Sequence, residues 1–471
     1  MTAPTVPTGR VPDEVRDATR PGPGRGTRMR SSMLVLVLAY AVFLVLPGEV
    51  ALVGPLRSNG APLRLLGLLA LFLVVAGFVR ADTRLRARPV AWLALAYVGF
   101  TLLAWTTAYM RLLDAQQSAE INRSVLIVLS GVGITLLAAV AVQELRDAHR
   151  LVGWLAAGAV LCVTVGGLQF VGVIDKWTDV VATPITTTVV GAMGVVGRLG
   201  FNRVPGTTSS PLEYSVVLAV VLPLVIHLVL HAGTRRARGM AGVAAAAILL
   251  GLPLGFSRSG LLTLVVTIVV MLVFLLPIHR WGLLLTTAFA AAGAVVVAPQ
   301  ITGVFRELVT TADQDDSIQG RLGDYPRVAE QFEQAPWFGN GPGSGPVLET
   351  VLDNQWLGTL VRDGIVGVVG LALLVVGGAA LAAWSASRAP VGSAARTFNG
   401  ALCAGLLGTA VAAAAFDLLA FQQATFAVFL LLGLVGVGVG RGASRGVVEA
   451  VADAPEGPGT TVDPERGTAP A

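Results

Sequence analysis

Apolar runs of about 20 residues follow one another along most of this chain, and they constrain its fold more than any other feature. The chain has 471 residues, of which 54% are hydrophobic and only 13% are charged, whereas soluble domains have a charged fraction of about 25%. About 20 apolar residues in an α-helix cross the hydrocarbon core of a bilayer. In lipid, backbone polar groups need partners within the protein, which a helix provides by itself. The sequence therefore predicts an all-α polytopic membrane protein.

We predict about twelve transmembrane helices. They cover residues 32–53, 63–80, 90–110, 123–143, 152–172, 211–231, 240–256, 261–278, 281–299, 361–383, 398–416 and 421–440. The turns at 80–88, 144–150 and 234–239 each carry two or more arginines, and short arginine-rich loops stay on the cytoplasmic side. Both termini are then cytoplasmic, and the segments 173–210 and 300–360 are extracytoplasmic loops.

The two ends of the chain differ in composition from the rest. Residues 1–31 are basic and rich in Pro and Gly, and residues 441–471 are rich in Pro, Gly and acidic side chains. Such segments cannot bury enough apolar surface to fold, so we predict two disordered cytoplasmic tails around a transmembrane domain at 32–440. The first apolar run lacks a small-residue cleavage site, which favours a retained helix over a signal peptide. Membrane topology accounts for the net charge of +5, so we expect no nucleic-acid partner.

Cysteine and histidine give no sign of a metal site. Cys162 and Cys403 fall inside apolar runs and show neither a disulfide framework nor a metal-ligand spacing. All four histidines lie in or beside predicted cytoplasmic turns: His149, His227, His231 and His279. His227 and His231 have a spacing that two metal ligands on one helix face would share, but a helix end near lipid headgroups is the favoured interpretation. A proton acceptor on the outer face would therefore be a carboxylate.

Arginines on the predicted outer face are the sharpest candidates for substrate binding. Arg258 lies at the tip of a tight hairpin, GFSRSG, between two apolar runs, and Arg203 and Arg321 lie in the two long loops. A guanidinium binds phosphate oxygens in a planar, bidentate way, so the three arginines suit a diphosphate at the membrane surface. The alternatives are snorkelling to the interface, or pairing with Glu213 or Asp417.

The second long loop adds a carboxylate and a glycine-rich turn. Asp353 and Asn354 precede a predicted helix. They are our candidate catalytic residues, with Asp353 as the general base, and the alternative is that they only cap the helix. Gly341 and Gly343 in GNGPGSG (339–345) offer backbone N–H groups to phosphate, or form only a turn. Residues 324–334 are expected to form a short amphipathic helix that Pro336 closes. Three nearby aspartates have side chains that bind divalent cations, but we interpret them as part of a solvated loop: Asp313, Asp315 and Asp316.

These pieces, in this order, resemble the O-antigen ligase and O-antigen polymerase superfamily of bacterial cell-envelope enzymes. The similar stretches are RVPGTTSSPLEYSVVLAVVLPL (203–224), FSRSG (256–260), GRLGDYPRVAEQFEQAPWFGNGPGSG (320–345) and DNQWLGTLVRDGIVG (353–367). They cover roughly residues 200–370, and the first five predicted helices match in hydropathy alone. Each motif is loose by itself, while their order, spacing and shared face make the resemblance moderately specific.

The resemblance implies a C-type glycosyltransferase-like membrane enzyme that needs no metal or cofactor. It implies transfer of a glycan from an undecaprenyl-diphosphate donor to a hydroxyl of a lipid, glycan or protein acceptor, on the outer face of the bacterial cell membrane. It also implies that Arg203, Arg258 and Arg321 hold the donor diphosphate. Asp353 stands where ligases of this superfamily usually carry a histidine, which favours a polymerase-like member or a transferase that uses Asp353.

Two other classes of protein share this hydropathy. A transporter or lipid-linked glycan flippase tends to show internal repeats and broken helices at the bilayer midplane. We find neither in this sequence, and the polar residues gather on one face. A non-enzymatic component of envelope assembly is the third alternative.

Overall fold

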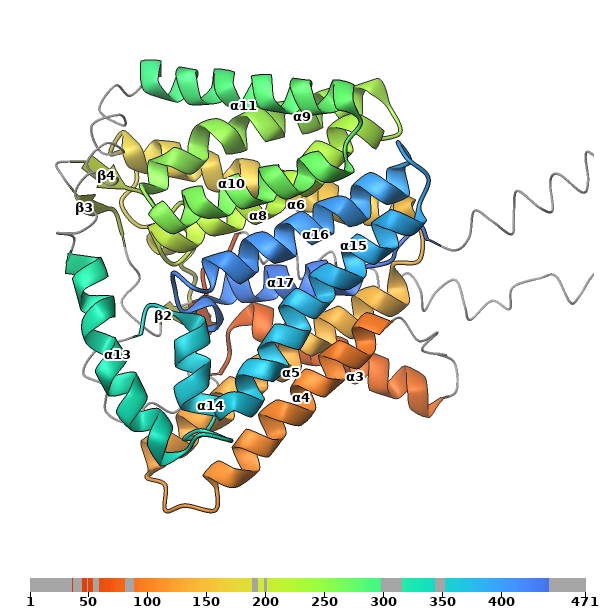
Figure 1. Cartoon of the computed structure of the whole chain (residues 1–471). Helices are drawn as coiled ribbons and strands as arrows, with labels where there is room; N and C mark the ends of the chain where they lie inside the picture. Colours follow the sequence, from red (N-terminus) through yellow and green to blue (C-terminus); the bar gives the residue numbers. More distant parts are fainter. Residues whose placement is uncertain are drawn as a thin grey trace, which may run out of the picture.

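The computed structural model is a helical bundle with a small elaboration at one end (Figure 1). The structure describes Leu36 and residues 45–48, 50–53, 59–80, 89–188, 194–198, 201–297, 316–343 and 352–439. Within these residues, seven helical segments are long and apolar enough to cross a membrane: α3 (Pro62–Val79), α4 (Pro89–Ala108), α5 (Ala115–Ala141), α6 (Leu145–Phe170), α8 (Pro211–His231), α9 (Arg235–Gly251) with η1 (Leu252–Gly255), and Gln355–Arg388. The chain is therefore a helical, polytopic membrane protein.

Four further apolar helices also fall on predicted spans. They are α10 (Arg258–Phe274), α11 (Pro277–Val297), α16 (Ala394–Ala412) and α17 (Gln422–Leu434). The predicted span 361–383 corresponds to a longer stretch, made of α14 (Gln355–Ala372), the π-helical η3 (Leu373–Gly377) and α15 (Gly378–Arg388). The first predicted span, 32–53, lies mostly outside the described residues, so the number twelve stays a prediction.

Local sequence signals explain where the helices begin. Ser210, Thr234, Ser257 and Ser393 each accept a hydrogen bond from a backbone N–H in the first turn of the helix that follows, which satisfies one of the donors that a helix start leaves open. Asp114 forms a full capping box at the start of α5. Each of these caps determines the residue at which a helix begins after the turn between two apolar runs.

Helix α8 lies at the centre of the bundle. It packs against α6, α9, α10, α16 and α17, and every residue from Tyr214 to Leu228 is buried. The outer helices instead expose large apolar side chains, including Phe72 on α3, Trp92 on α4 and Phe289 on α11. In a membrane protein such surfaces face lipid, which is as apolar as the protein interior.

One end of the bundle carries the short elements (Figure 1). Helix α7 (Trp177–Val181) precedes β2 (Thr186–Thr188), which pairs antiparallel with β1 (Val50–Leu52). β3 (Val196–Arg198) and β4 (Phe201–Arg203) form a second antiparallel pair. The fold is thus mostly helical but not all-α, because backbone groups in β1–β4 form hydrogen bonds between paired strands. β2, β3, β4, α13 and α14 lie at this end, opposite the turn from α15 to α16 (Figure 1).

Helix α13 (Asp316–Gln334) is the observed form of the predicted amphipathic helix. It ends where we expected, two residues before Pro336. It begins at Asp316 rather than at residue 324, and Pro326 lies inside it, at a position that the rules for helix interiors disfavour.

Candidate functional site

The turn between η1 and α10 holds Arg258 in a fixed place. Phe256 has a left-handed backbone conformation, with φ 42°, which makes the reversal tight. Ser257 then caps α10 by accepting from the N–H of Gly260 at 3.2 Å. Arg258 is therefore the first residue of α10, at the end of the bundle that also carries the short strands.

The same turn is packed closely against the central helix. Gly255 and Gly260 both lie against Ser215 of α8, and a Cβ atom on either glycine would overlap its side chain. Helix α10 has only 17 residues, which at 1.5 Å per residue span about 25 Å, less than the roughly 30 Å of a hydrocarbon core. The turn with Arg258 is thus anchored on α8, and α10 lies at the short end of the length range for a membrane-spanning helix.

Arg203 reaches the turn that carries Arg258. Its Nε donates to the carbonyl oxygen of Gly255 at 3.3 Å, and the N–H of Val204 donates to Leu254 at 3.3 Å. Both arginine side chains are half-buried. The structure therefore brings together two arginines that lie far apart in the sequence.

The segment after Arg203 folds into the bundle instead of lying in water. Residues 204–211 are all buried. The side chain of Gln169 on α6 accepts from the N–H of Gly206 at 2.7 Å and donates to its carbonyl oxygen at 3.2 Å. Gly206 has φ +60°, and a Cβ there would overlap Tyr214 and the backbone of Cys162. This close packing holds Arg203 against the η1–α10 turn.

Arg321 lies in α13, but its side chain belongs to the part of the chain that the structure does not describe. Helix α13 lies at the same end of the bundle as β3 and β4 (Figure 1). The alternative cation ligands Asp313 and Asp315 lie outside the described residues.

Helix α14 is broken at Gly364, and a second segment crosses the break. Gly364 has φ 67° and ψ −165°, which no helix contains. The N–H groups of Ile365 and Val366 donate instead to the carbonyl oxygens of Pro336 and Trp337, at 2.9 and 3.1 Å. We call residues 336–341 the strap. It satisfies backbone groups that would otherwise be left without partners at the break.

Hydrogen bonds in the other direction complete this pairing. The N–H groups of Asn340 and Gly341 donate to the carbonyl oxygens of Val361 and Arg362, at 3.2 and 2.7 Å. Because the N–H of Gly341 already has this acceptor, we give Gly341 a structural role rather than one in phosphate binding.

Glycine is required where the strap meets its neighbours. Gly339 (φ +65°) and Gly364 (φ +67°) each approach the backbone of the other segment so closely that a Cβ would overlap it. A Cβ on Gly343 (φ +75°) would overlap Ser124 of α5. Arg111 also ties the strap to the α4–α5 turn by donating to Asn340 Oδ1 at 2.8 Å. The glycines therefore allow the strap to pack closely against α14 and α5.

Asn354, and not Asp353, caps α14. The Asn354 side chain accepts from the N–H groups of Trp356 and Leu357, at 3.0 and 3.2 Å. Asp353 immediately precedes this cap and is exposed. Of the two predicted capping residues the structure selects Asn354, and the Asp353 carboxylate is left at the surface beside the helix start.

The start of α14 rests on the connection between α16 and α17. The backbone N–H of Gln355 donates to Ala413 at 2.8 Å, and its side-chain oxygen accepts from Leu419 at 2.7 Å. Trp356 Nε1 donates to the carbonyl oxygen of Ala410 at 3.1 Å. These contacts position Asp353 and Asn354 relative to the bundle.

An ion pair that the sequence interpretation missed lies about two turns further along α14. Arg362 Nη2 lies 2.9 Å from Asp417 Oδ2, and the side chains are 24% and 6% exposed. Asp417 was an alternative partner for the three outer-face arginines, but it forms a salt bridge with Arg362. Both residues border predicted membrane spans, where a charge needs a partner, and that was the signal available in the sequence.

The other alternative partner of the three arginines, Glu213, is buried and accepts from the backbone N–H groups of Ser209 and Ala424, each at 3.0 Å.

Two more carboxylates therefore stand near the broken helix. Asp363 Oδ1 and Asp417 Oδ1 are buried and have no hydrogen-bond partner among the described residues. A buried carboxylate oxygen without a partner is destabilising and commonly has another use. Besides Asp353, these two side chains are candidates for accepting a proton.

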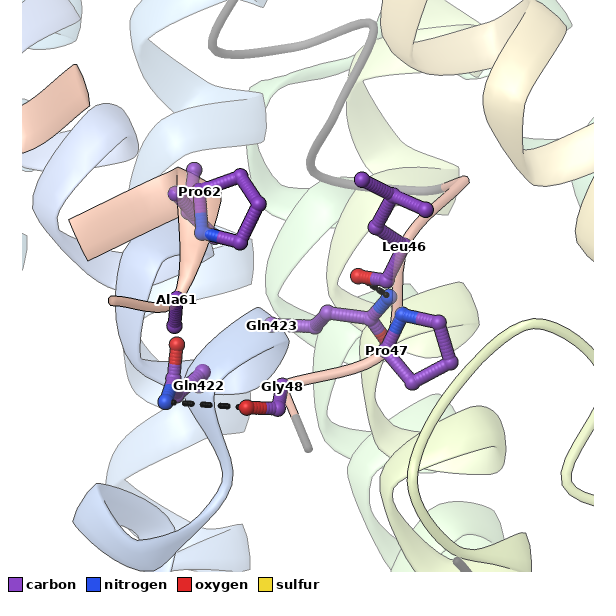
Figure 2. Close-up of a pocket in the computed structure, with 8 residues that line it drawn as sticks. Leu46, Pro47, Gly48, Ala61, Pro62, Gln422 and Gln423 are labelled. Carbon is purple, nitrogen blue, oxygen red and sulfur yellow. Dashed lines mark hydrogen bonds between the residues drawn. The ribbon is translucent and has the colours of Figure 1, made fainter. Parts of the chain in front are cut away.

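A small cavity lies where α17 begins (Figure 2). Gln422 Nε2 donates to the carbonyl oxygen of Gly48 at 3.2 Å, and Gln423 Nε2 donates to Leu46 at 3.3 Å and to Thr207 at 3.2 Å. The space of about 10 Å³ has room for roughly one water molecule. This cavity is too small for a glycan, and the two glutamines serve to hold residues 46–48 against the bundle.

Comparison with known families gives one match. Residues 243–372 match the family model described as O-Antigen ligase. The matched segment runs from α9 to the end of α14, so it contains the Arg258 turn, the strap and Asp353. No curated protein matches the chain.

Proposed function

We propose that the protein transfers a glycan from an undecaprenyl-diphosphate donor to an acceptor hydroxyl. The match of residues 243–372 to the O-antigen ligase family model supports placing the chain in the O-antigen ligase and polymerase superfamily. Transfer takes place on the extracytoplasmic face of the bacterial cell membrane, with both termini in the cytoplasm and without a metal. The acceptor is a further glycan or a lipid. The family match supports glycan transfer in a membrane; the donor, the acceptor and the residue roles are our proposal.

The contact between Arg203 and the turn of Arg258 is the observation that carries this proposal. It places the Arg203 guanidinium against the turn from which Arg258 begins a short helix. In the reaction the bond between the anomeric carbon and the diphosphate oxygen breaks, and the acceptor oxygen bonds to that carbon. The leaving diphosphate gains negative charge, which fixed cations stabilise most strongly away from bulk water. We assign Arg203 and Arg258 to this diphosphate, together with Arg321 on α13.

The proton of the acceptor hydroxyl needs a base, and we assign this role to Asp353. Its carboxylate is exposed at the start of α14, where an acceptor can approach it. Asn354 beside it keeps the helix start in place through its two backbone hydrogen bonds. The ion pair of Arg362 with Asp417 stabilises the part of α14 that follows.

Deleting the gene in its native host tests this function. Cells without the protein should accumulate polyprenyl-diphosphate-linked glycan on the outer face of the membrane and lose the transferred product. A flippase would leave the same lipid on the inner face, because it acts before transfer. Accumulation on the cytoplasmic face would therefore contradict the proposal in favour of a transporter.

Asp353→Asn should lower turnover by about a hundredfold or more and change donor binding little, because the substitution removes a proton acceptor and keeps the side-chain shape. Asp353→Ala also removes the proton acceptor and leaves the helix cap in place, since Asn354 provides the cap. Consumption of lipid-linked glycan in membranes measures both. Asn354→Ala is the control for the helix start and should lower stability by about 1 kcal/mol. Turnover of Asp353→Asn close to that of the wild type would exclude this residue as the base and direct attention to Asp363.

A further inference from the structure

Three polar side chains from three helices meet at the end of the bundle opposite the Arg258 turn. His149 near the start of α6 and His227 near the end of α8 approach with 2.8 Å between their Nε2 atoms. His227 Nδ1 lies 3.0 Å from Thr397 Oγ1 on α16. His227 is completely buried, so it lies inside the protein and not near lipid headgroups as its position in the sequence had indicated.

The distance between the two Nε2 atoms determines how many protons can lie between the two rings. At 2.8 Å the contact is a hydrogen bond, in which one ring nitrogen must donate and the other must accept. The Thr397 hydroxyl can donate to its own helix carbonyls at Ser393 and Ala394 or to His227, which selects between two tautomers. In either tautomer a single proton lies between the two Nε2 atoms.

The surroundings add positive rather than negative charge. His231 on α8 acts electrostatically on His227, and His279 on α11 and Arg238 on α9 act in turn on His231. On α6 itself, Asp147 pairs with Arg150 at 3.2 Å, and Glu144 is exposed at the helix start. Within the described residues, no group of three or more His, Cys, Asp and Glu side chains is arranged to hold a metal ion.

We propose that the His149–His227 contact is an acid-sensitive link between α6 and α8. With one shared proton it joins the two helices. When both rings are protonated, two N–H groups and two positive charges face each other, with His231 also nearby, and the link opens. Histidine is the side chain that changes charge between about pH 5 and 8, so the link responds to acidification of the compartment that this end of the bundle faces.

The thermal stability of the full-length protein in lipid nanodiscs tests this link. Between pH 7.5 and 5.5 the Tm of the wild type should fall by about 3 °C or more. His149→Gln keeps an N–H donor but cannot take up a proton, so its Tm should fall by less than half as much. His279→Gln on α11 is the matched control, and its Tm should fall as much as the Tm of the wild type.

Hydrogen exchange at pH 5.5 and 7.5 gives a second, local readout. After correction for the intrinsic pH dependence, residues 145–155 and 222–231 should exchange several-fold faster at pH 5.5 in the wild type and not in His149→Gln. If His149→Gln does not fold, His149→Asn takes its place. An equal fall of Tm in His149→Gln and the wild type, or exchange in these segments that does not change with pH, would overturn the proposal.

Discussion

Arg258→Ala is expected to abolish glycan transfer while leaving the protein folded in the membrane. One lost charge contact to the leaving diphosphate costs about 3 kcal/mol, roughly a hundredfold in rate. Lysine should rescue poorly, because a point charge does not reproduce the planar fork of a guanidinium. The measurement is the rate of lipid-linked glycan consumption in membranes that contain equal amounts of each variant.

Arg388→Ala is the matched control for this substitution. Arg388 ends α15 at the opposite end of the bundle, where its guanidinium lies 4.7 Å from the ring centroid of Trp384. Its removal should leave the transfer rate unchanged. Transfer by Arg258→Ala at a rate near that of Arg388→Ala would remove Arg258 from the donor site.

Gly364→Ala should have the largest effect on folding. A non-glycine residue at this positive φ costs about 1–2 kcal/mol in backbone strain. The new Cβ would also overlap the backbone of Trp337 in the strap, so the strap and the broken helix could not stay paired. We expect much less monodisperse protein after detergent extraction and a lower Tm for the protein that is recovered.

Gly242→Ala separates this effect from the general effect of adding a methyl group. Gly242 lies in α9 with no atom near the position of a Cβ. Alanine in a helix interior is about 0.5–1 kcal/mol more favourable than glycine, so this variant should be at least as stable as the wild type. Equal stability of Gly364→Ala and Gly242→Ala would contradict the role of the strap.

The hydropathy of the sequence predicted where the helices lie along the chain, but not which helices are buried at the centre of the bundle. Helices α3 and α8 have nearly the same mean hydropathy, 2.3 and 2.2, yet 28% of the first and 83% of the second is buried. Lipid and protein interior are equally apolar solvents for a helix, so a one-dimensional pattern cannot separate them. The polar residues of α8, such as Glu213 and His227, were the signal of its central position.

The candidate site stays a prediction. Arg203 and Arg258 were proposed for one site because of their residue type and face, and in the structure the Arg203 side chain contacts Gly255, in the turn just before Arg258. The pairing of the strap with α14 was not predictable from this sequence alone, because each glycine is equally compatible with an isolated turn. Only the backbone contacts show that Gly339 lies against Arg362 and that Gly364 lies against Trp337.

The most direct test of the proposed function uses the purified protein in lipid nanodiscs. The substrate is polyprenyl-diphosphate-linked glycan isolated from cells that lack the protein, which also supplies the acceptor glycan. The account predicts release of polyprenyl diphosphate together with a longer glycan, and loss of both in Arg258→Ala. Donor that stays intact in nanodiscs, but crosses the bilayer when the same protein is placed in liposomes, would contradict it.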